Sequence, residues 1–126
     1  MSEANEKLVR DFLALWAVRD AAGMADCFAE DGVYDNVPEK KPMIGRAAIR
    51  AWLDMVFQHI DRIDVEMLNI SSKGEWVLNE RIDDHIALDG KHMPLPVMNA
   101  TRIVDGEIVM FRDYYCRKTV AALGMG

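Results

Sequence analysis

The hydrophobic pattern of the chain changes its period once, near residue 60, and this change restricts the possible folds. Before that point, apolar residues recur at steps of three and four, which is typical of amphipathic helices. After it, apolar and polar residues alternate loosely, which is typical of half-buried strands. Helices followed by a run of strands indicate an α+β domain rather than alternating βαβ units. We expect helices over residues 5–18, 21–28 and 45–60, a short extended piece over 33–36, and strands over 63–71, 76–88, 93–104 and 107–117.

The composition indicates one globular domain over residues 1–126. It is 51% hydrophobic, enough for a core with room for a pocket, and this apolar content argues against a disordered chain. A net charge of −6 argues against nucleic acid as a partner, because nucleic acid needs a basic surface. No apolar run is long enough to cross a membrane, and the acidic N-terminus does not resemble a signal peptide, so we expect a cytoplasmic protein. Cys27 and Cys116 form no CxxC, so we expect neither a disulfide scaffold nor a cysteine-based zinc site.

The predicted strand over 76–88 carries charged residues where a half-buried strand should be apolar. Side chains alternate between the two faces of a strand, so Arg81 and Asp83 share a face and lie within reach of each other. That face carries Val77, Asn79, Arg81, Asp83 and His85.

The last predicted strand repeats this departure at Asp113, which shares a face with Phe111 and Tyr115. A carboxylate on an apolar face is costly unless it is paired. Arg81 is a suitable partner, because its guanidinium can serve two carboxylates at once. The plainer interpretation is a cross-strand ion pair between Arg81 and Asp113 on a solvated face.

Two carboxylates that share one arginine can have a chemical use. Neighbouring carboxylates push their pKa values apart, so one can hold a proton while the other is ionised. One site can then supply both an acid and a base near neutral pH.

Tyr34 and Asn36 also lie two residues apart, and so on one face of a short strand. A hydroxyl and an amide are suited to holding a water molecule or a substrate oxygen. Alternatively, Tyr34 packs at the edge of a sheet and Asn36 ends its strand.

Taken together, these elements resemble the limonene-1,2-epoxide hydrolase family, within the nuclear transport factor 2-like, SnoaL-like superfamily. The resemblance covers most of the chain from Phe28 to Arg117, and it depends on the combination of motifs rather than on any one of them. The matching segments are Val33-Tyr34-Asp35-Asn36-Val37-Pro38, Pro42, Gly45-Arg46, Asn79-Glu80-Arg81-Ile82-Asp83, Gly90-Lys91, Asp105-Gly106-Glu107-Ile108 and Phe111-Arg112-Asp113-Tyr114-Tyr115.

The resemblance implies a curved mixed β-sheet packed with N-terminal helices around a cone-shaped pocket, the cystatin-like arrangement, usually as a homodimer. It also implies one-step addition of water to a small apolar epoxide, without cofactor, metal or covalent intermediate. By this resemblance, Asp113 is the general base on a water held by Tyr34 and Asn36. Asp83 protonates the epoxide oxygen, and Arg81 bridges the two aspartates.

The walls of the pocket depend on the hairpin at Asp105-Gly106. A two-residue type I′ turn would place Met98 on the side of Asp113, whereas a three-residue loop with a Gly106 bulge would place Leu95 and Val97 there. The family alignment favours the second, so we expect Leu95 and Val97 to line the pocket. The other expected substrate-binding residues are Val56, Ile60, His85, Phe111 and Tyr115.

His85 departs from the family, which usually carries an apolar residue there. His85 either lies near the mouth of the pocket and touches water, or narrows or polarises the site and shifts the choice of substrate. Two other functions stay open: an isomerase or cyclase of the same fold acting on a steroid- or polyketide-like substrate, and a small-molecule binding module without catalysis. An epoxide opened by an internal hydroxyl would use the same acid and base.

Overall fold

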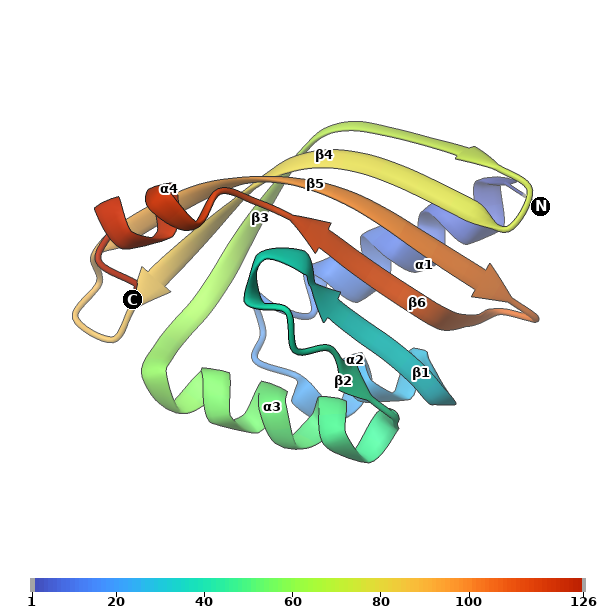
Figure 1. The fold of residues 1–126 in the computed structure, drawn as a ribbon, viewed down its shortest axis with the longest axis horizontal. Helices are drawn as coiled ribbons and strands as arrows, with labels where there is room; N and C mark the ends of the chain where they lie inside the picture. The colour runs from blue at the N-terminus through green and yellow to red at the C-terminus, as the bar shows by residue number, and fades with distance from the viewer. Residues whose placement is uncertain (1, 126) are drawn as a thin grey trace.

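A computed structural model describes residues 2–125 and has the α+β architecture that the sequence predicts (Figure 1). The six strands form one mixed sheet in the order β2-β1-β6-β5-β4-β3, in which only β1 and β6 run parallel. The elements are α1 (Ser2–Ala14), α2 (Ala21–Asp26), β1 (Phe28–Asn36), the 3-10 helix η1 (Val37–Glu39), β2 (Met43–Ile44), α3 (Arg46–His59), β3 (Ile60–Lys73), β4 (Trp76–Ala87), β5 (His92–Val104), β6 (Glu107–Tyr114) and α4 (Arg117–Ala122).

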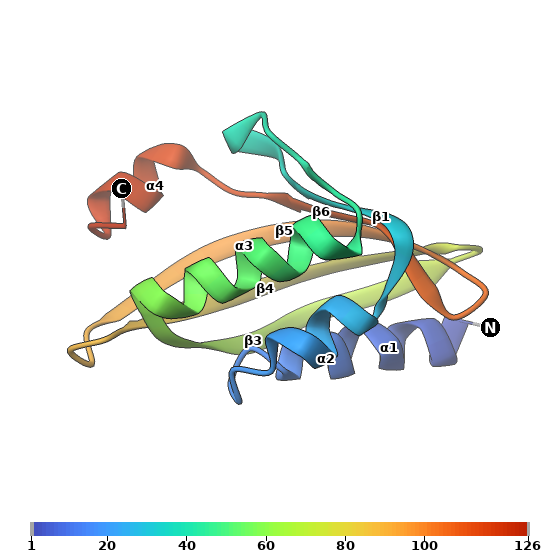
Figure 2. The same cartoon turned by 90° about the horizontal axis from the view of Figure 1, so that it is seen from below.

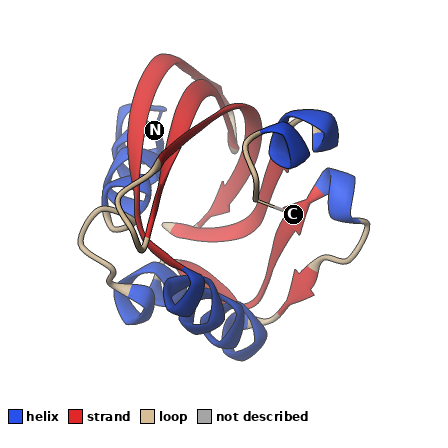
Figure 3. Ribbon diagram, turned by 90° about the vertical axis from the view of Figure 1, so that its left-hand side faces the viewer, coloured by secondary structure: helices blue, strands red, loops and turns tan. Residues whose placement is uncertain are grey.

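The sheet is strongly curved, and helices α1, α2 and α3 lie on its concave side (Figures 2 and 3). Their apolar faces bury Phe12, Leu53 and Phe57 against the strands. A chain of aromatic contacts continues from Phe12 through Phe111 to Tyr34, with ring centroids 4.9 Å apart at each step. This aromatic layer supports the concave face at the level of the candidate site. No helix within residues 2–125 has the length and apolar character needed to cross a membrane.

The first helix begins and ends earlier than predicted, over Ser2–Ala14 rather than residues 5–18. It ends at Ala14, and a turn that includes Arg19, with φ +58°, follows. The Arg19 guanidinium donates to the carbonyl oxygens of Phe57, Ile60 and Asp61, where α3 meets β3. Arg19 is therefore a C-terminal cap for α3, and this explains a charged residue at the end of an apolar repeat.

The C-terminal segment differs from the prediction. The last strand ends at Tyr114 rather than Arg117, and residues Arg117–Ala122 form the helix α4. Helix α4 has six residues, and Val120 is the only one of them that is buried. A helix this short shows no periodic apolar pattern from which it could be predicted. Figure 2 shows that α4 lies at the end of the sheet that is remote from α1.

The hairpin between β5 and β6 places the predicted wall residues toward the pocket, although its turn is not of the expected type. Its turn has two residues, Asp105 and Gly106, with φ of +52° and +76°, and pairs Val104 with Glu107. This is the type I′ pattern rather than the three-residue loop. The register then shifts by one residue at Val109, because Ile103 pairs with Ile108 and Arg102 pairs with Met110.

Because of this one-residue shift, the residues of β5 face the same sides as they would after the expected three-residue loop. Asn99 pairs with Asp113, and Leu95 and Val97 are buried on the concave side. Met98 is 53% exposed on the opposite face, next to Tyr114. Leu95 and Val97 therefore lie on the side of Asp113, as expected, whereas the predicted bulge at Gly106 is wrong.

The two prolines of β5 lie where they do not disturb the sheet. Pro94 and Pro96 pair with β4, but β6 ends at Tyr114 opposite Met98 and does not reach them. This part of β5 is thus a local edge, as a strand with two prolines requires.

Candidate active site

The concave side of the sheet holds a cavity of about 660 Å³. All the predicted site residues line it except Arg81 and Phe111. Those that line it are Tyr34 and Asn36 of β1, Val56 of α3, Ile60 of β3, Asp83 and His85 of β4, Leu95 and Val97 of β5, Asp113 of β6, and Tyr115 just beyond β6.

Arg81 lies directly behind the two carboxylates and is fully buried. Its Nε and Nη2 donate to the two oxygens of Asp83 at 2.8 and 3.1 Å, and Nη2 also donates to Oδ1 of Asp113 at 2.8 Å. The side chains of Asp83 and Asp113 are only 7% and 6% exposed. The interpretation of a solvated surface ion pair is therefore wrong: one buried guanidinium joins two buried carboxylates.

A layer of buried amides, for which the sequence analysis gave no role, supports this group. The Nη1 of Arg81 donates to Asn79 at 2.9 Å, and Asn79 donates to the Oδ1 of Asn99 at 3.1 Å. Asn99 in turn donates to Oδ1 of Asp113 at 2.8 Å, and the hydroxyl of Thr101 donates to Asn99. Asn99 and Thr101 follow Leu95 and Val97 at every second position, so strand alternation finds them once the register is known.

Asp113 keeps one oxygen free for chemistry. Its Oδ1 accepts bonds from Arg81 and Asn99, while Oδ2 has no donor within residues 2–125. Burial raises the pKa of Asp113 above the usual carboxyl range, and the charge of Asp83 adds to this. The Arg81 cation and the Asn99 hydrogen bond act in the opposite direction. A carboxylate with a raised pKa is a stronger base than one on the surface.

Tyr34 and Asn36 lie on the strand next to Asp113. In the parallel pairing of β1 with β6, Asn36 is opposite Asp113 and Tyr34 is opposite Phe111. Burial, followed by the nearby Asp113 charge, raises the pKa of the Tyr34 hydroxyl well above its usual range, so this group is a neutral O–H donor. Neither side chain has a hydrogen-bond partner in the described part of the chain, so both are available to a water or a ligand.

Phe111 was predicted as a wall residue, and this is wrong. It is fully buried beneath the site, in contact with Tyr34 and Phe12, and it does not line the cavity. Its ring lies 5.6 Å from the Arg81 guanidinium carbon. Phe111 thus supports the floor of the site through packing and a cation–π contact.

Several cavity residues were missed as pocket residues by the sequence analysis. Trp52 lies on the predicted apolar face of α3, but periodicity cannot separate a pocket wall from core. Val120 and Met125 belong to the segment beyond Arg117, for which no element was predicted.

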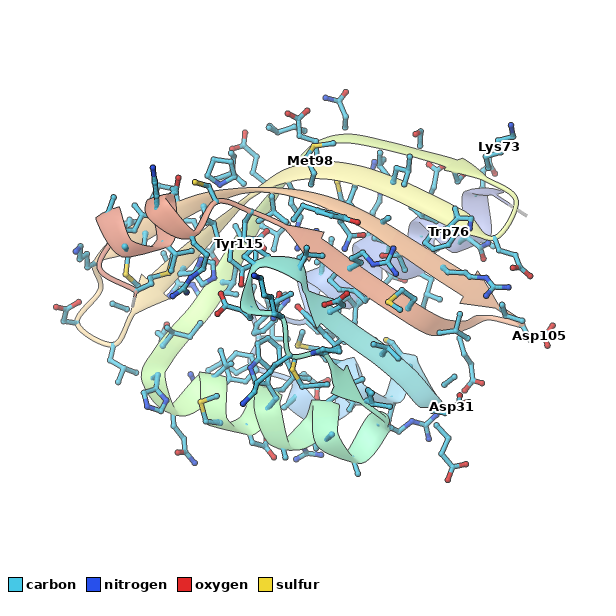
Figure 4. The ribbon with its side chains drawn as sticks, in the orientation of Figure 1. Asp31, Lys73, Trp76, Met98, Asp105 and Tyr115 are labelled. Carbon is cyan, nitrogen blue, oxygen red and sulfur yellow. The ribbon has the colours of Figure 1, made fainter. Side chains whose placement is uncertain are left out.

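The η1 segment is joined to the chain beyond β6 at one side of the cavity. The Tyr115 hydroxyl donates to Oε2 of Glu39 at 2.7 Å, and Arg117 donates to the same oxygen at 3.1 Å. Figure 4 labels Tyr115 where β6 ends, above η1. Tyr115 therefore lines the cavity with its ring, while its hydroxyl is engaged by Glu39.

The donor set offers acid–base chemistry rather than metal ligation. Among residues 2–125, no three His, Cys, Asp or Glu side chains are grouped so that they could hold a metal ion. The site presents a free carboxylate oxygen, an O–H donor and an amide on two neighbouring strands that line one cavity, with a second carboxylate on the same arginine. Such a set can hold a water, remove its proton and deliver a proton to another oxygen.

Comparison with known proteins relates the fold of this chain to a widespread domain. A sequence model described as a SnoaL-like domain matches residues 9–111. An LEH-like epoxide hydrolase from M. tuberculosis superposes with a TM-score of 0.85 at 22% identity, covering 97% of this chain and 90% of that one.

Two other structures are as similar in fold. A hypothetical protein with a ketosteroid isomerase-like fold from Catenulispora acidiphila, in complex with trimethylamine, gives a TM-score of 0.84 at 23% identity, covering 94% and 93% of the two chains. A putative SnoaL-like polyketide cyclase from Shewanella denitrificans gives 0.84 at 13% identity, covering 94% and 95%. The fold is thus shared by proteins described as epoxide hydrolase, isomerase-like and cyclase.

Proposed function

Because the chain belongs to the SnoaL-like domain family, whose fold serves several reactions, we propose from its site that it is an epoxide hydrolase. It would add water to an epoxide and release a vicinal diol in one step. The observation that carries this proposal is the pair of buried carboxylates on Arg81, with Tyr34 and Asn36 beside one of them. An isomerase would use a second carboxyl group only to donate a hydrogen bond to a developing oxyanion, whereas ring opening requires that group to give its proton to the departing oxygen.

In the proposed mechanism, Asp113 is the base. A water held by Tyr34 and Asn36 attacks one epoxide carbon, and the free Oδ2 of Asp113 takes a proton from that water. The carbon–oxygen bond of the ring breaks, and Asp83 gives its proton to the departing oxygen. No cofactor is consumed, and no bond forms between the enzyme and the substrate.

Asp83 must therefore hold a proton before each turnover. In the free protein both of its oxygens accept from Arg81. Protonation would replace one of these bonds with a bond from Asp83 to the epoxide oxygen. After the reaction the proton on Asp113 must return to Asp83, and the shared Arg81 keeps the two carboxyl groups close enough for that exchange.

The proposal is tested with a panel of terpene, cyclohexene, cyclopentene and styrene oxides. We expect diol formation by the wild-type protein and a loss in kcat/KM of about 10²- to 10⁴-fold in Asp113→Asn and in Asp83→Asn. Circular dichroism should show that both variants keep the fold. Absence of diol with every epoxide, or full activity in Asp113→Asn, would refute the proposal.

The two roles can be separated with a matched pair of epoxides. In 3-chloro-1,2-epoxypropane, chlorine replaces the terminal methyl group of 1,2-epoxybutane and makes the departing oxygen less basic. A substrate of this kind needs less help from an acid. The loss caused by Asp83→Asn should therefore be smaller with the chloro compound, while the loss caused by Asp113→Asn should be similar for both. The opposite pattern would exchange the two roles.

Opening of an epoxide by a hydroxyl of the same substrate is the second candidate. The cavity of about 660 Å³ is large for a small epoxide and one water, which takes up about 30 Å³ in the liquid. A longer substrate with an internal nucleophile would fill it better and would use the same acid and base. Such a reaction yields a cyclic ether and takes up no oxygen from water, so the product distinguishes the two.

A further inference from the structure

His85 places a free acceptor atom between two apolar residues of the cavity wall, Ile63 and Met93. Its Nδ1 lies 3.0 Å from the carbonyl oxygen of Asp83. A carbonyl oxygen can only accept, so Nδ1 carries the hydrogen and donates it. In the neutral ring, Nε2 is then the acceptor.

Nothing in the described chain satisfies that acceptor. Nε2 has no hydrogen-bond partner within residues 2–125, and no enclosed side-chain nitrogen or oxygen there lacks one. Nε2 therefore keeps access to solvent space, and His85 is half-buried and lines the cavity. Its partners across the neighbouring strands are Ile63 and Met93, which also line the cavity and are apolar.

The position of His85 relative to Asp83 gives the acceptor a defined place. The two residues are two apart on β4, which is about 7 Å at the rise of a strand. Ala87, Leu88 and Asp89 follow along the cavity wall toward the end of β4. His85 thus lies between the proposed acid and the turn at that end.

We propose that the substrate carries a hydroxyl group on the side of its epoxide that faces the end of β4, and that this hydroxyl donates to Nε2 of His85. This inference rests on the proposed function for the epoxide itself. A purely hydrocarbon substrate would remove water from Nε2 without replacing its hydrogen bond, and that loss weakens binding. The preferred substrate is therefore a hydroxylated epoxide rather than the wholly apolar one expected from the sequence.

A matched pair of ligands tests the hydroxyl. In 4-(2-hydroxyethyl)cyclohexene 1,2-oxide, a hydroxyl replaces the terminal methyl of 4-propylcyclohexene 1,2-oxide at nearly constant size. At about pH 8, where an imidazole is ordinarily neutral, we expect the wild-type protein to favour the hydroxyl compound about tenfold in kcat/KM. The same preference should appear in dissociation constants measured by calorimetry on Asp113→Asn, where turnover does not interfere.

Three variants show whether His85 is the cause. His85→Leu should abolish the preference, and His85→Gln should restore part of it, because an amide oxygen also accepts. His59 is the matched control: it lines the cavity, its Nδ1 lies 2.9 Å from a backbone carbonyl, and it is exposed at the end of α3. His59→Leu should leave the preference unchanged.

The outcomes separate this inference from the proposed function. A hydroxyl preference in binding that disappears in His85→Leu supports the inference, even if neither epoxide is hydrolysed and the proposed function falls. Equal binding of the two compounds by the Asp113→Asn protein, or a preference that survives His85→Leu, overturns the inference, even if both epoxides are hydrolysed.

Discussion

Replacement of Arg81 by Met should reveal how strongly the two carboxylates depend on one cation. Met is apolar and reaches about as far as Nε of Arg81, so it fills the space of the alkyl stem but provides no donor. Arg81 is fully buried, and the carboxylates it holds are 7% and 6% exposed. Removing one partner from a buried ion pair costs about 3–5 kcal/mol, because the remaining charge is left without compensation. At neutral pH this is a large share of the roughly 5–15 kcal/mol by which a domain is stable.

The loss should depend on pH in a definite direction. Without Arg81, the buried carboxyl pair holds protons in the folded variant that the unfolded chain releases above about pH 4. The stability of the variant should therefore fall as pH rises. For each proton retained, the fall is about 2.7 kcal/mol between about pH 5 and pH 7. The deficit relative to wild type should be largest near pH 7 and should shrink toward pH 5.

Urea unfolding at both pH values measures this deficit by linear extrapolation. The control is Arg50→Met, which breaks an exposed ion pair with Asp54 and should cost less than about 1 kcal/mol at either pH. If Arg81→Met costs no more than the control at about pH 7, or if its deficit does not change with pH, the description of a buried pair that depends on one cation is wrong.

Two further predictions follow from the neighbours of the site and from the outer face of the sheet. Asn99→Leu removes a hydrogen-bond donor that lowers the pKa of Asp113. The pKa of the base should therefore rise, and the acidic limb of a kcat/KM–pH profile should move to higher pH by about one unit. An unmoved limb would show that Asn99 does not act through Asp113. We also propose a homodimer formed through the outer sheet face, where Met98 and Tyr114 are paired neighbours and are 53% and 46% exposed. Light scattering should then show a dimer for the wild type, a monomer for Met98→Lys, and a dimer for the control Val18→Lys, which changes an exposed residue after α1; a wild-type monomer would contradict this.

The sequence predicted the charged centre because charge is conspicuous on a strand face that should be apolar. Arg81, Asp83 and Asp113 departed from the expected alternation, and their departures pointed to the same place. Asn99 escaped notice, because a neutral amide on a strand does not stand out until its partners are known. Its position depends on the bulge at Val109, which the turn sequence does not specify.

Phe111 and α4 show a second limit of the sequence. Phe111 lies on the same strand face as Asp113, as predicted. The alternation of a strand indicates the face on which a side chain lies but not how deeply it is buried, and the ring of Phe111 packs in the aromatic layer beneath the site. Helix α4 buries one residue, so no periodic pattern predicts it. Depth and short elements are set by packing between distant segments, and a local pattern carries no information about such packing.

In the proposed mechanism, water adds directly to the epoxide at the carboxylate pair on Arg81. A single turnover in ¹⁸O-water, with enzyme in excess over an epoxide that the enzyme hydrolyses, distinguishes this direct addition from a covalent intermediate. We predict that the diol formed in that first turnover carries one ¹⁸O atom, and that Asp113→Asn forms no labelled diol on the same timescale. An unlabelled diol, with ¹⁸O appearing in an aspartate of the protein, would instead indicate a covalent ester and contradict the account.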